Sequence, residues 1–254
     1  MGRAMVHGIV GSGVADAKSV FVADPDSAAL EDLRAATGVN TSSVNREVAR
    51  VADVLFLSVK PYLYGDVIDD IKDALPEQAV VVSIAPGVTI DFMEKRFGRK
   101  VKIIRTMPNT PALVGEGMMG MCPGTFAAQF DVEMVREICS SFAVTEIVNE
   151  NLMDVVTAVS GSSPAYVYMF IEAMADAAVM GGMTRDRAYT FAAQSVYGSA
   201  KMVLETGLHP GVLKDMVCSP GGTTIRAVKV LEERGMRAAV IDAVEECMKA
   251  SRGE

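Results

Sequence analysis

The stretch SPGGTTIRAVKVLEE, residues 219–233, joins a glycine-rich turn to an amphipathic helical pattern. Successive backbone N–H groups at such a junction point outward with the positive end of the helix dipole, so they can hold an anion. The hydroxyls of Ser219 and Thr224 would add further donors. The residues alone leave two interpretations open: a well-capped helix, or a binding site for a small carboxylate.

Polar residues also follow predicted strands, at the end where ligands of parallel sheets bind. The segments are SVKP (58–61), IAPG (84–87) and MPNTP (107–111). Lys60 is either an ordinary loop lysine or a ligand contact. Asn109 stands between two prolines in a stiff turn, which is either a plain turn or presents an amide that recognises a nicotinamide carboxamide.

The first half of the chain alternates short apolar runs with helical patterns. Almost unbroken apolar runs are typical of parallel strands that are covered on both faces. We expect strands at 19–24, 52–59, 79–85 and 101–107, and helices at 27–37 and 64–75. This β-α-β order predicts an α/β fold with a doubly wound parallel sheet and right-handed crossovers.

From about residue 151 the chain shows no further apolar strand and is rich in alanine and methionine at helical spacing. A helix as apolar as AYVYMFIEAMADAAVMGGM must be buried, in a bundle core or against another subunit. We therefore expect an α/β domain at 1–148 and an all-helical dimerisation domain at 149–254.

The composition excludes several classes of protein. Of the 254 residues, 50% are hydrophobic and 22% are charged, whereas a disordered chain has few hydrophobic residues and a high net charge. The net charge of −8 comes without a cluster of lysine and arginine, which argues against a nucleic-acid partner. No apolar run reaches the roughly 18 residues of a membrane helix and no signal-peptide pattern occurs, so we expect a cytoplasmic protein without a membrane partner.

Metal and histidine chemistry are not expected from the sequence. The cysteines form no C-x-x-C pair, which predicts reduced and mostly buried thiols at Cys122, Cys139, Cys218 and Cys247. The only histidines are His7 and His209, too few for a histidine-rich metal site and in no recognisable nucleophile context.

Several segments follow one another in a distinctive order and spacing: ADVLFLSVKP, VVSIAPGVT, RTMPNTPALVGEGM, AVSGSSPAYVYMFIEAMADA and HPGVLKDMVCSPGGTTIRAVKVLE. In this arrangement the chain closely resembles the pyrroline-5-carboxylate reductase family over its whole length. The resemblance implies an NAD(P)H-dependent oxidoreductase acting on a CH–NH bond, which passes a hydride to the C=N carbon of 1-pyrroline-5-carboxylate and yields L-proline, the last step of proline biosynthesis. It also implies that residues 1–148 are a Rossmann-type dinucleotide-binding domain, truncated at its N-terminus. Residues 149–254 would be a helical substrate-binding domain that interlocks with a second subunit as a homodimer or ring of dimers.

The resemblance also assigns roles to residues. The substrate carboxylate would be held by Ser219, Thr223 and Thr224, and Glu150 would approach the ring nitrogen at the domain junction. Thr224 and Lys60 would be the catalytic residues. The residues along NADPH or NADH would be Gly2, Asp24, Asn45, Ser58, Val59, Lys60, Pro61, Ile84, Ala85, Pro86 and Asn109.

Asp24 bears on the choice of cofactor. It ends a predicted strand at the position where an acidic side chain normally binds the ribose 2′-hydroxyl of NAD. A carboxylate there should repel the 2′-phosphate of NADP, yet the resembling family often uses NADPH. The sequence leaves both NADPH and NADH open.

The opening glycines look like a dinucleotide-binding loop in the wrong order. By the resemblance, residues 1–5 match the end of the glycine fingerprint and the start of the following helix, and GIVGSG (8–13) is the far end of that helix with its glycine stop. The first strand and the first fingerprint glycines would then be missing, at a cost of roughly 1–3 kcal/mol for each unpaired ladder group. We expect the natural protein to begin about ten residues upstream, since that strand is central in such a sheet.

Two alternatives remain open. One is another NAD(P)-dependent imine or β-hydroxyacid reductase of the same two-domain plan. The other is a non-catalytic dimeric remnant that lacks the phosphate loop, although such a protein has no physical need to keep SPGGTT, MPNTP and SVKP together.

Overall fold

The computed structural model describes residues 1–254, which divide into two compact units. The first consists of Met1–Ser162 together with Cys247–Glu254, and the second of Ser163–Glu246. The boundary between a cofactor domain and a substrate domain that we expect after residue 148 stays a prediction. The first compact unit of the structure continues past that boundary to Ser162, and it also includes the C-terminal residues Cys247–Glu254.

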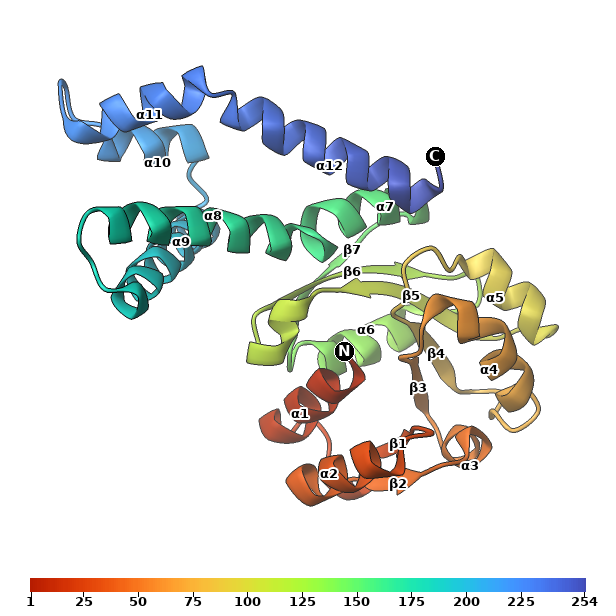
Figure 1. Ribbon diagram of the computed structural model, residues 1–254. Coiled ribbons are helices and arrows are strands. Elements are labelled where there is room, and N and C mark those ends of the chain that lie inside the picture. The colour runs from red at the N-terminus through yellow and green to blue at the C-terminus, as the bar shows by residue number, and fades with distance from the viewer. The chain divides into compact units, whose positions relative to one another are not determined.

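The first unit contains a five-stranded sheet in the order β3-β4-β5-β6-β7 and a separate parallel pair, β1-β2 (Figure 1). The strands are β1 (Phe21–Ala23), β2 (Asn40–Ser42), β3 (Val54–Leu57), β4 (Val80–Ser83), β5 (Lys102–Pro108), β6 (Gly117–Pro123) and β7 (Ala143–Ile147). Neighbours β3, β4 and β5 run parallel, as the apolar runs predict. Strands β1 and β3 therefore each have one edge without a strand partner.

One pair departs from the parallel sheet expected. Strands β5 and β6 are antiparallel, with Thr106 opposite Met121. The link between them is only the short 3-10 turn η3 (Thr110–Val114), and a parallel return would need a crossover of a dozen residues or more. The chain must therefore reverse, and the fold is a mixed Rossmann-type sheet.

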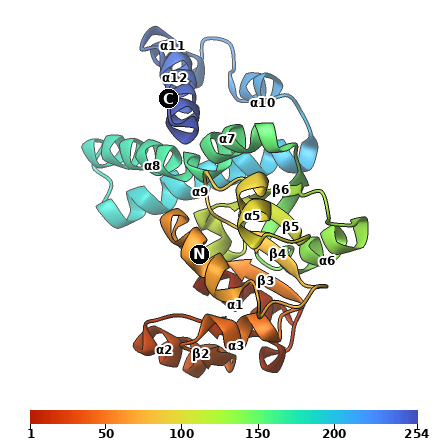
Figure 2. The ribbon, with the colours of Figure 1, turned by 90° about the vertical axis from the view of Figure 1, so that its right-hand side faces the viewer.

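Helices cover both faces of the five-stranded sheet (Figures 1 and 2). The alternation of side chains along β4 sends Val81 to one face and Val80 and Val82 to the other. Helices α4 (Tyr64–Ile71) and α5 (Ile90–Phe97) pack on the first face, and α1 (Gly2–Ser12) and α6 (Gln129–Cys139) pack on the second. The remaining elements of this unit are η1 (Ala17–Ser19), α2 (Ser27–Thr37), α3 (Asn45–Arg50), η2 (Pro61–Leu63), η4 (Glu150–Leu152), α7 (Met153–Val156) and the π-helical turn η5 (Thr157–Gly161).

The glycines of residues 8–13 lie in the last turns of helix α1 and at its C-terminal end. Helix α1 stops at Gly13, which has φ 76° in the left-handed region, and its N–H donates to the carbonyl of Val10. This confirms that residues 8–13 are the end of a helix with a glycine stop, since a side chain at this φ would be strained.

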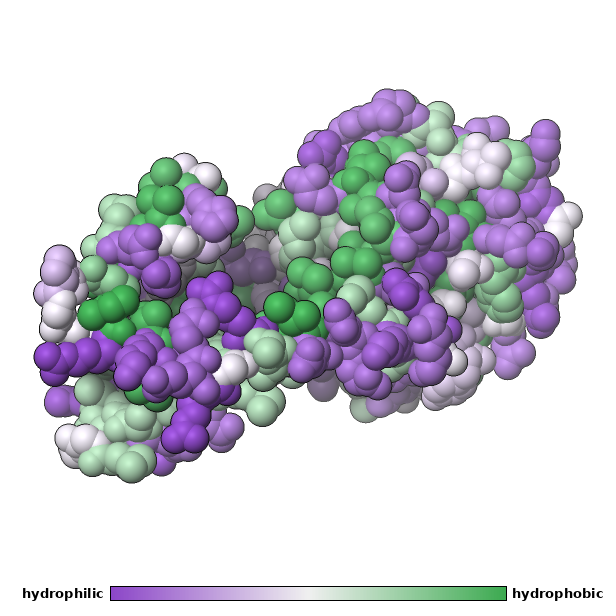
Figure 3. All heavy atoms as spheres, turned by 90° about the horizontal axis from the view of Figure 1, so that it is seen from above, coloured by the Kyte–Doolittle hydropathy of each residue, from purple (hydrophilic) through white to green (hydrophobic).

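The second unit is all-helical: α8 (Ser163–Met180), α9 (Arg185–Thr206), α10 (Pro210–Val217), α11 (Thr223–Glu233) and most of α12 (Met236–Arg252). Its small core lies between α8 and α9, where Ala175, Ala188 and Ala192 allow close packing. Helices α10, α11 and α12 bury no residue completely. Figure 3 shows hydrophobic side chains at the surface among polar ones.

The chain has no candidate membrane helix and no disulfide bond. No helix of the chain is both long and apolar enough to cross a membrane. All four cysteines are free: Cys122 and Cys139 are buried, and Cys218 and Cys247 are half-buried.

Cys139 predicts a loss of stability at high pH. Burial in α6 raises the pKa of its thiol from 9.0 to about 12, so the unfolded chain loses this proton first as the pH rises. The free energy of unfolding should fall between pH 9 and pH 12, by up to about 1.4 kcal/mol per pH unit. Urea unfolding across this window should show a shallower fall for Cys139→Ala, and an unchanged slope for the half-buried Cys218→Ala. Equal slopes in wild type and Cys139→Ala would contradict the assignment.

Candidate active site

The candidate residues of the first unit gather at one edge of its sheet. The segments 58–61 and 84–86 follow β3 and β4, which are adjacent and parallel, so their carboxyl ends meet. Ser58, Lys60, Pro61 and Pro86 are exposed, Val59 and Ile84 are half-buried, and Ala85 is buried. Lys60 makes no ion pair, so its ammonium group is free to meet an anion at this edge.

The Tyr64 hydroxyl ties these two segments together. It is fully buried and donates to the carbonyl of Leu57 over 2.7 Å, at the end of β3. It also accepts from Ser83 Oγ at 3.0 Å and from the Ile84 N–H at 3.3 Å, at the end of β4. Burial raises the pKa of Tyr64, which outweighs the hydrogen bonds that lower it, so the hydroxyl keeps its proton and continues to donate. Thr106 Oγ1 extends the link to β5 by donating to the Ser83 carbonyl at 2.8 Å.

Removing this hydroxyl should weaken the sheet edge. Tyr64→Phe leaves the Leu57 carbonyl and the Ser83 hydroxyl without their buried partner, so we expect the free energy of unfolding to fall by about 1–3 kcal/mol. Urea unfolding measures this change. Tyr62→Phe is the matched control because Tyr62 is 80% exposed, and it should change the stability by less than about 0.5 kcal/mol. Equal losses in the two variants would refute the role of the hydroxyl.

The start of α1 lies beside this edge and fits a dinucleotide. A Cβ at Gly2 would lie 3.3 Å from Ser58 Cβ, so the helix begins directly against the end of β3. No side chain caps this helix N-terminus. Uncapped N–H groups at a helix start bind phosphate oxygens, and the free ammonium group of Lys60 belongs to the same edge. The residues present thus suit the diphosphate of NADPH or NADH.

The two outer cofactor candidates lie near the smaller strand pair. Asp24 is exposed and directly follows β1, and its N–H donates to the Ser42 carbonyl at 3.4 Å. Asn45 begins α3, and its side-chain amide donates to Asp70 Oδ2 at 3.4 Å.

Asn109 is engaged inside the protein. Asn109 is only 8% exposed. Its side-chain Nδ2 donates to the Ser160 carbonyl at 3.0 Å, and its Oδ1 accepts from the Met118 N–H at 2.9 Å. The amide thus links β5 to the start of β6 and to the turn η5. The side chain holds its own turn, and its contact with a nicotinamide stays a prediction.

Glu150 likewise has partners within the first unit. Its Oε1 accepts from Arg105 Nη1 at 2.9 Å and from the Ile90 N–H at 2.8 Å, so it links β5 to the start of α5. The side chain of Arg105 is only 7% exposed and its Nε has no partner. Burial first, and Glu150 second, raise the pKa of the neighbouring Cys122 thiol, which stays protonated. The contact of Glu150 with a substrate nitrogen remains a prediction.

In the second unit, the turn before α11 has the expected form. Gly221 has φ 69°, and the Gly222 N–H donates to the Ser219 carbonyl at 3.0 Å. A side chain at Gly222 would collide with the Ser219 hydroxyl, so that hydroxyl lies over the helix start. No side chain caps α11, which begins at Thr223. The capped-helix interpretation is therefore wrong for these side chains, and the N–H groups remain available to an anion, together with the exposed Ser219 and Thr223 and the half-buried Thr224.

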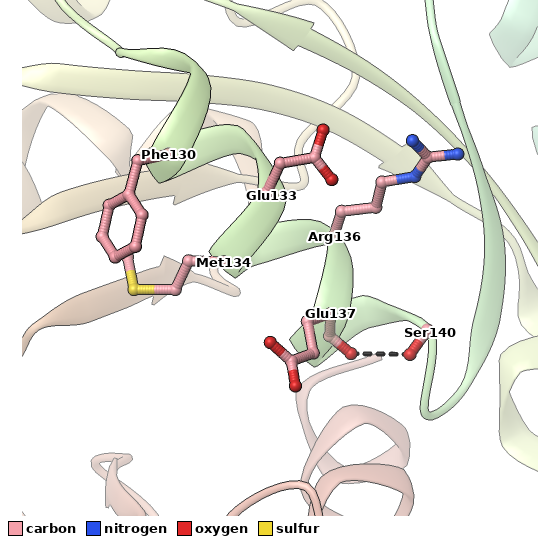
Figure 4. Close-up of a pocket in the computed structure, with 6 residues that line it drawn as sticks. All are labelled: Phe130, Glu133, Met134, Arg136, Glu137 and Ser140. Atoms are coloured by element: carbon pink, nitrogen blue, oxygen red, sulfur yellow. Dashed lines mark hydrogen bonds between the residues drawn. The ribbon is translucent and has the colours of Figure 1, made fainter.

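A surface hollow lies away from these residues, on α6. A cavity of about 450 Å³ is lined by residues of α6 and the residue that follows it, Phe130, Glu133, Met134, Arg136, Glu137 and Ser140 (Figure 4). The dashed bond in Figure 4 joins Ser140 Oγ to the Glu137 carbonyl of the same helix, over 2.7 Å. None of the candidate residues lines it. A smaller hollow of about 340 Å³ does include Pro86, with Gly87, Thr157, Cys247, Ala250 and Ser251.

Sequence reasoning missed the polar groups that hold this edge. The sequence pattern places Tyr64 in a predicted helix and Ser83 and Arg105 in predicted apolar strands. The available signal was the interruption of apolar strands by Ser83 and Arg105, since a buried polar side chain requires a partner.

Comparison with known proteins decides the family. The pyrroline-5-carboxylate reductase of Escherichia coli (strain K12) is 51% identical over 251 residues, covering 99% of this chain and 93% of the relative. The chain belongs to the pyrroline-5-carboxylate reductase family. Residues 150–254 match a family profile described as pyrroline-5-carboxylate reductase dimerisation, and residues 1–87 match one described as NADP oxidoreductase coenzyme F420-dependent.

Solved structures of the pyrroline-5-carboxylate reductase family share the fold. A pyrroline-5-carboxylate reductase from Coxiella burnetii superposes with a TM-score of 0.93 at 33% identity, covering 99% of this chain and 94% of that one. A Plasmodium falciparum pyrroline carboxylate reductase with NADP bound gives 0.89 at 34% identity, covering 100% and 94%. These findings confirm the family predicted from the sequence.

Proposed function

We propose that this protein reduces 1-pyrroline-5-carboxylate to L-proline with NADPH or NADH. The observation that carries the proposal is the 51% identity, over 99% of the chain, to a protein of that activity. The uncapped helix starts at α1 and α11 support it, because an enzyme of this reaction must bind both the diphosphate of a dinucleotide and the carboxylate of the substrate.

The turn before α11 is proposed to hold the substrate carboxylate. Its free N–H groups and the hydroxyls of Ser219, Thr223 and Thr224 are all donors, and a carboxylate accepts only. Hydrogen bonds to a charged acceptor are about twice as strong as neutral ones. Fixing the acid group would orient the ring carbon that is to be reduced.

The sheet edge of the first unit is proposed to hold the cofactor. The start of α1 and Lys60 would bind the diphosphate, and the segments after β3 and β4 would lie along the nucleotide. When bound, the reduced nicotinamide supplies the hydride for the C=N bond. The Tyr64 hydroxyl would act indirectly, by holding both segments in register.

Little acid–base chemistry is required from the chain. A cyclic imine is basic enough to arrive protonated, so hydride addition at carbon yields an amine without a strong general acid. A chain with only two histidines suits this demand. Catalysis would consist mainly of positioning and of electrostatic binding of the carboxylate.

We also propose that the active protein is a homodimer in the cytoplasm. Exposed apolar residues of the second unit, such as Met180 at 90% and Leu204 at 84%, are suited to burial against a second copy. The free cysteines fit a reducing compartment.

The test is steady-state oxidation of NADPH and of NADH that depends on 1-pyrroline-5-carboxylate, with L-proline identified as the product. A six-membered cyclic imine acid serves as the competing substrate. We expect turnover with the five-membered ring to dominate. Faster turnover of the larger ring would favour another imine reductase, and no turnover with either would favour a non-catalytic dimer.

A further inference from the structure

We propose that this protein prefers NADH to NADPH, and that the turn between β1 and α2 sets the preference. The inference rests on the proposed function, since it concerns the dinucleotide that the sheet edge would bind. It is carried by the hydrogen bonds and charges of residues 24–29 and of the neighbouring end of β2.

The carboxylate of Asp24 is held in a position that suits a ribose. Its Oδ1 accepts from the Asp26 N–H at 2.9 Å, which fixes the side chain in an Asx turn at the carboxyl end of β1. Its Oδ2 accepts no hydrogen bond within the protein, and the residue is exposed. A fixed carboxylate oxygen at this end of the strand can accept from the 2′-hydroxyl of NADH, whereas a 2′-phosphate offers it no donor.

The backbone of the same turn offers few free donors to a phosphate. Pro25 has no N–H, and the Asp26 N–H is used by Asp24. The N–H groups of Ala28 and Ala29, at the start of α2, both donate to Asp26 Oδ1, at 3.0 and 3.1 Å. Carboxylates of the chain thus occupy three of the four N–H groups of residues 26–29 that a 2′-phosphate could use, and only the Ser27 N–H among them has no partner.

The end of β2 adds another negative charge. Ser42 Oγ donates to Glu47 Oε2 at 2.6 Å, so a further carboxylate lies beside the strand that pairs with β1. The nearby cation, Arg46, is directed at α4, where its Nε donates to the carbonyl and to Oδ1 of Asp70, both at 2.7 Å.

Two further cations of this region, Lys18 and Arg34, lie away from the turn. Lys18 precedes β1, at the opposite end of that strand, and Arg34 lies in the last turn of α2. The local charge around Asp24 is therefore negative, which opposes the two extra negative charges of a 2′-phosphate.

Direct binding of the two dinucleotides tests the proposal without turnover. Fluorescence titration of the full chain with NADH and with NADPH should give a dissociation constant for NADPH about tenfold or more above that for NADH. Asp24→Asn keeps an acceptor for the Asp26 N–H but removes the charge, so it should bring the ratio close to one. Asp32→Asn makes the same charge change on the exposed surface of α2, and should leave the ratio unchanged.

The outcomes separate the cofactor inference from the proposed function. Equal or tighter binding of NADPH by the wild type overturns the preference, even where pyrroline-5-carboxylate is reduced. An unchanged ratio in Asp24→Asn, or an equal change in Asp32→Asn, overturns the role of Asp24. Failure to bind either dinucleotide, with no reduction of pyrroline-5-carboxylate, overturns the proposed function and the preference with it.

Discussion

Thr224→Ala is expected to lower kcat/KM for 1-pyrroline-5-carboxylate by about 10- to 150-fold. The range corresponds to the loss of a hydrogen bond to a charged group, which contributes about 1.5–3 kcal/mol. Thr224 is half-buried in the first turn of α11, where the helix start has no side-chain cap. Its hydroxyl would therefore act together with the N–H groups on one carboxylate.

The kinetic parameters distinguish binding from a structural role. A hydroxyl that holds the carboxylate equally before and during reduction should raise KM and leave kcat nearly unchanged. Thr224→Ser keeps the hydroxyl and should restore most of the lost activity. Thr37→Val is the control, because the Thr37 hydroxyl donates only to the Leu33 carbonyl of its own helix. Unchanged kinetics in Thr224→Ala would remove the α11 turn from the substrate site.

Glu150→Ala is expected to lower the free energy of unfolding by up to about 3–5 kcal/mol, the upper limit being the cost of leaving a buried charge without its partner. The Arg105 side chain is 7% exposed, and its Nε already lacks a partner, so the remaining cation would be poorly solvated. The Ile90 N–H at the start of α5 would also lose its acceptor. Such a loss is large against a typical total of about 5–15 kcal/mol.

Companion variants separate this structural role from a role in catalysis. Arg105→Met should cost less than Glu150→Ala, because the remaining Glu150 side chain is 36% exposed and can reach water. Asp91→Ala breaks an exposed ion pair with Lys95 and should cost about 0–1 kcal/mol. Urea unfolding measures all of them. A loss in Glu150→Ala no larger than that in Asp91→Ala would contradict the prediction.

Glu150→Gln addresses the predicted substrate contact. The amide oxygen can still accept from the Ile90 N–H, so this variant should be more stable than Glu150→Ala. If the carboxylate also meets the ring nitrogen, KM should rise in Glu150→Gln even at temperatures where the protein is fully folded. An unchanged KM would leave Glu150 with its structural role alone.

Many of the strands and helices of the first unit can be predicted from the sequence, because their apolar patterns lie within short segments of the chain. The apolar runs that predict strands at 52–59, 79–85 and 101–107 contain β3, β4 and β5, and the helix predicted at 27–37 is α2. Strands β2, β6 and β7 were missed. Strand β2 is polar and β6 is built from glycine and methionine, so neither carries the β-branched pattern that marks a strand.

The sequence alone determined the family, through the order and spacing of several segments along the chain. It also determined the glycine stop of α1 and the turn before α11, because each of these two depends on residue types within a few positions of one another. Only the tertiary structure decided the partners of the buried polar groups. Glu150 meets Arg105 from 45 residues away, and Asn109 meets Ser160 from 51 residues away. A side chain's type shows that it needs a partner, but the fold determines which distant atom lies within hydrogen-bonding distance.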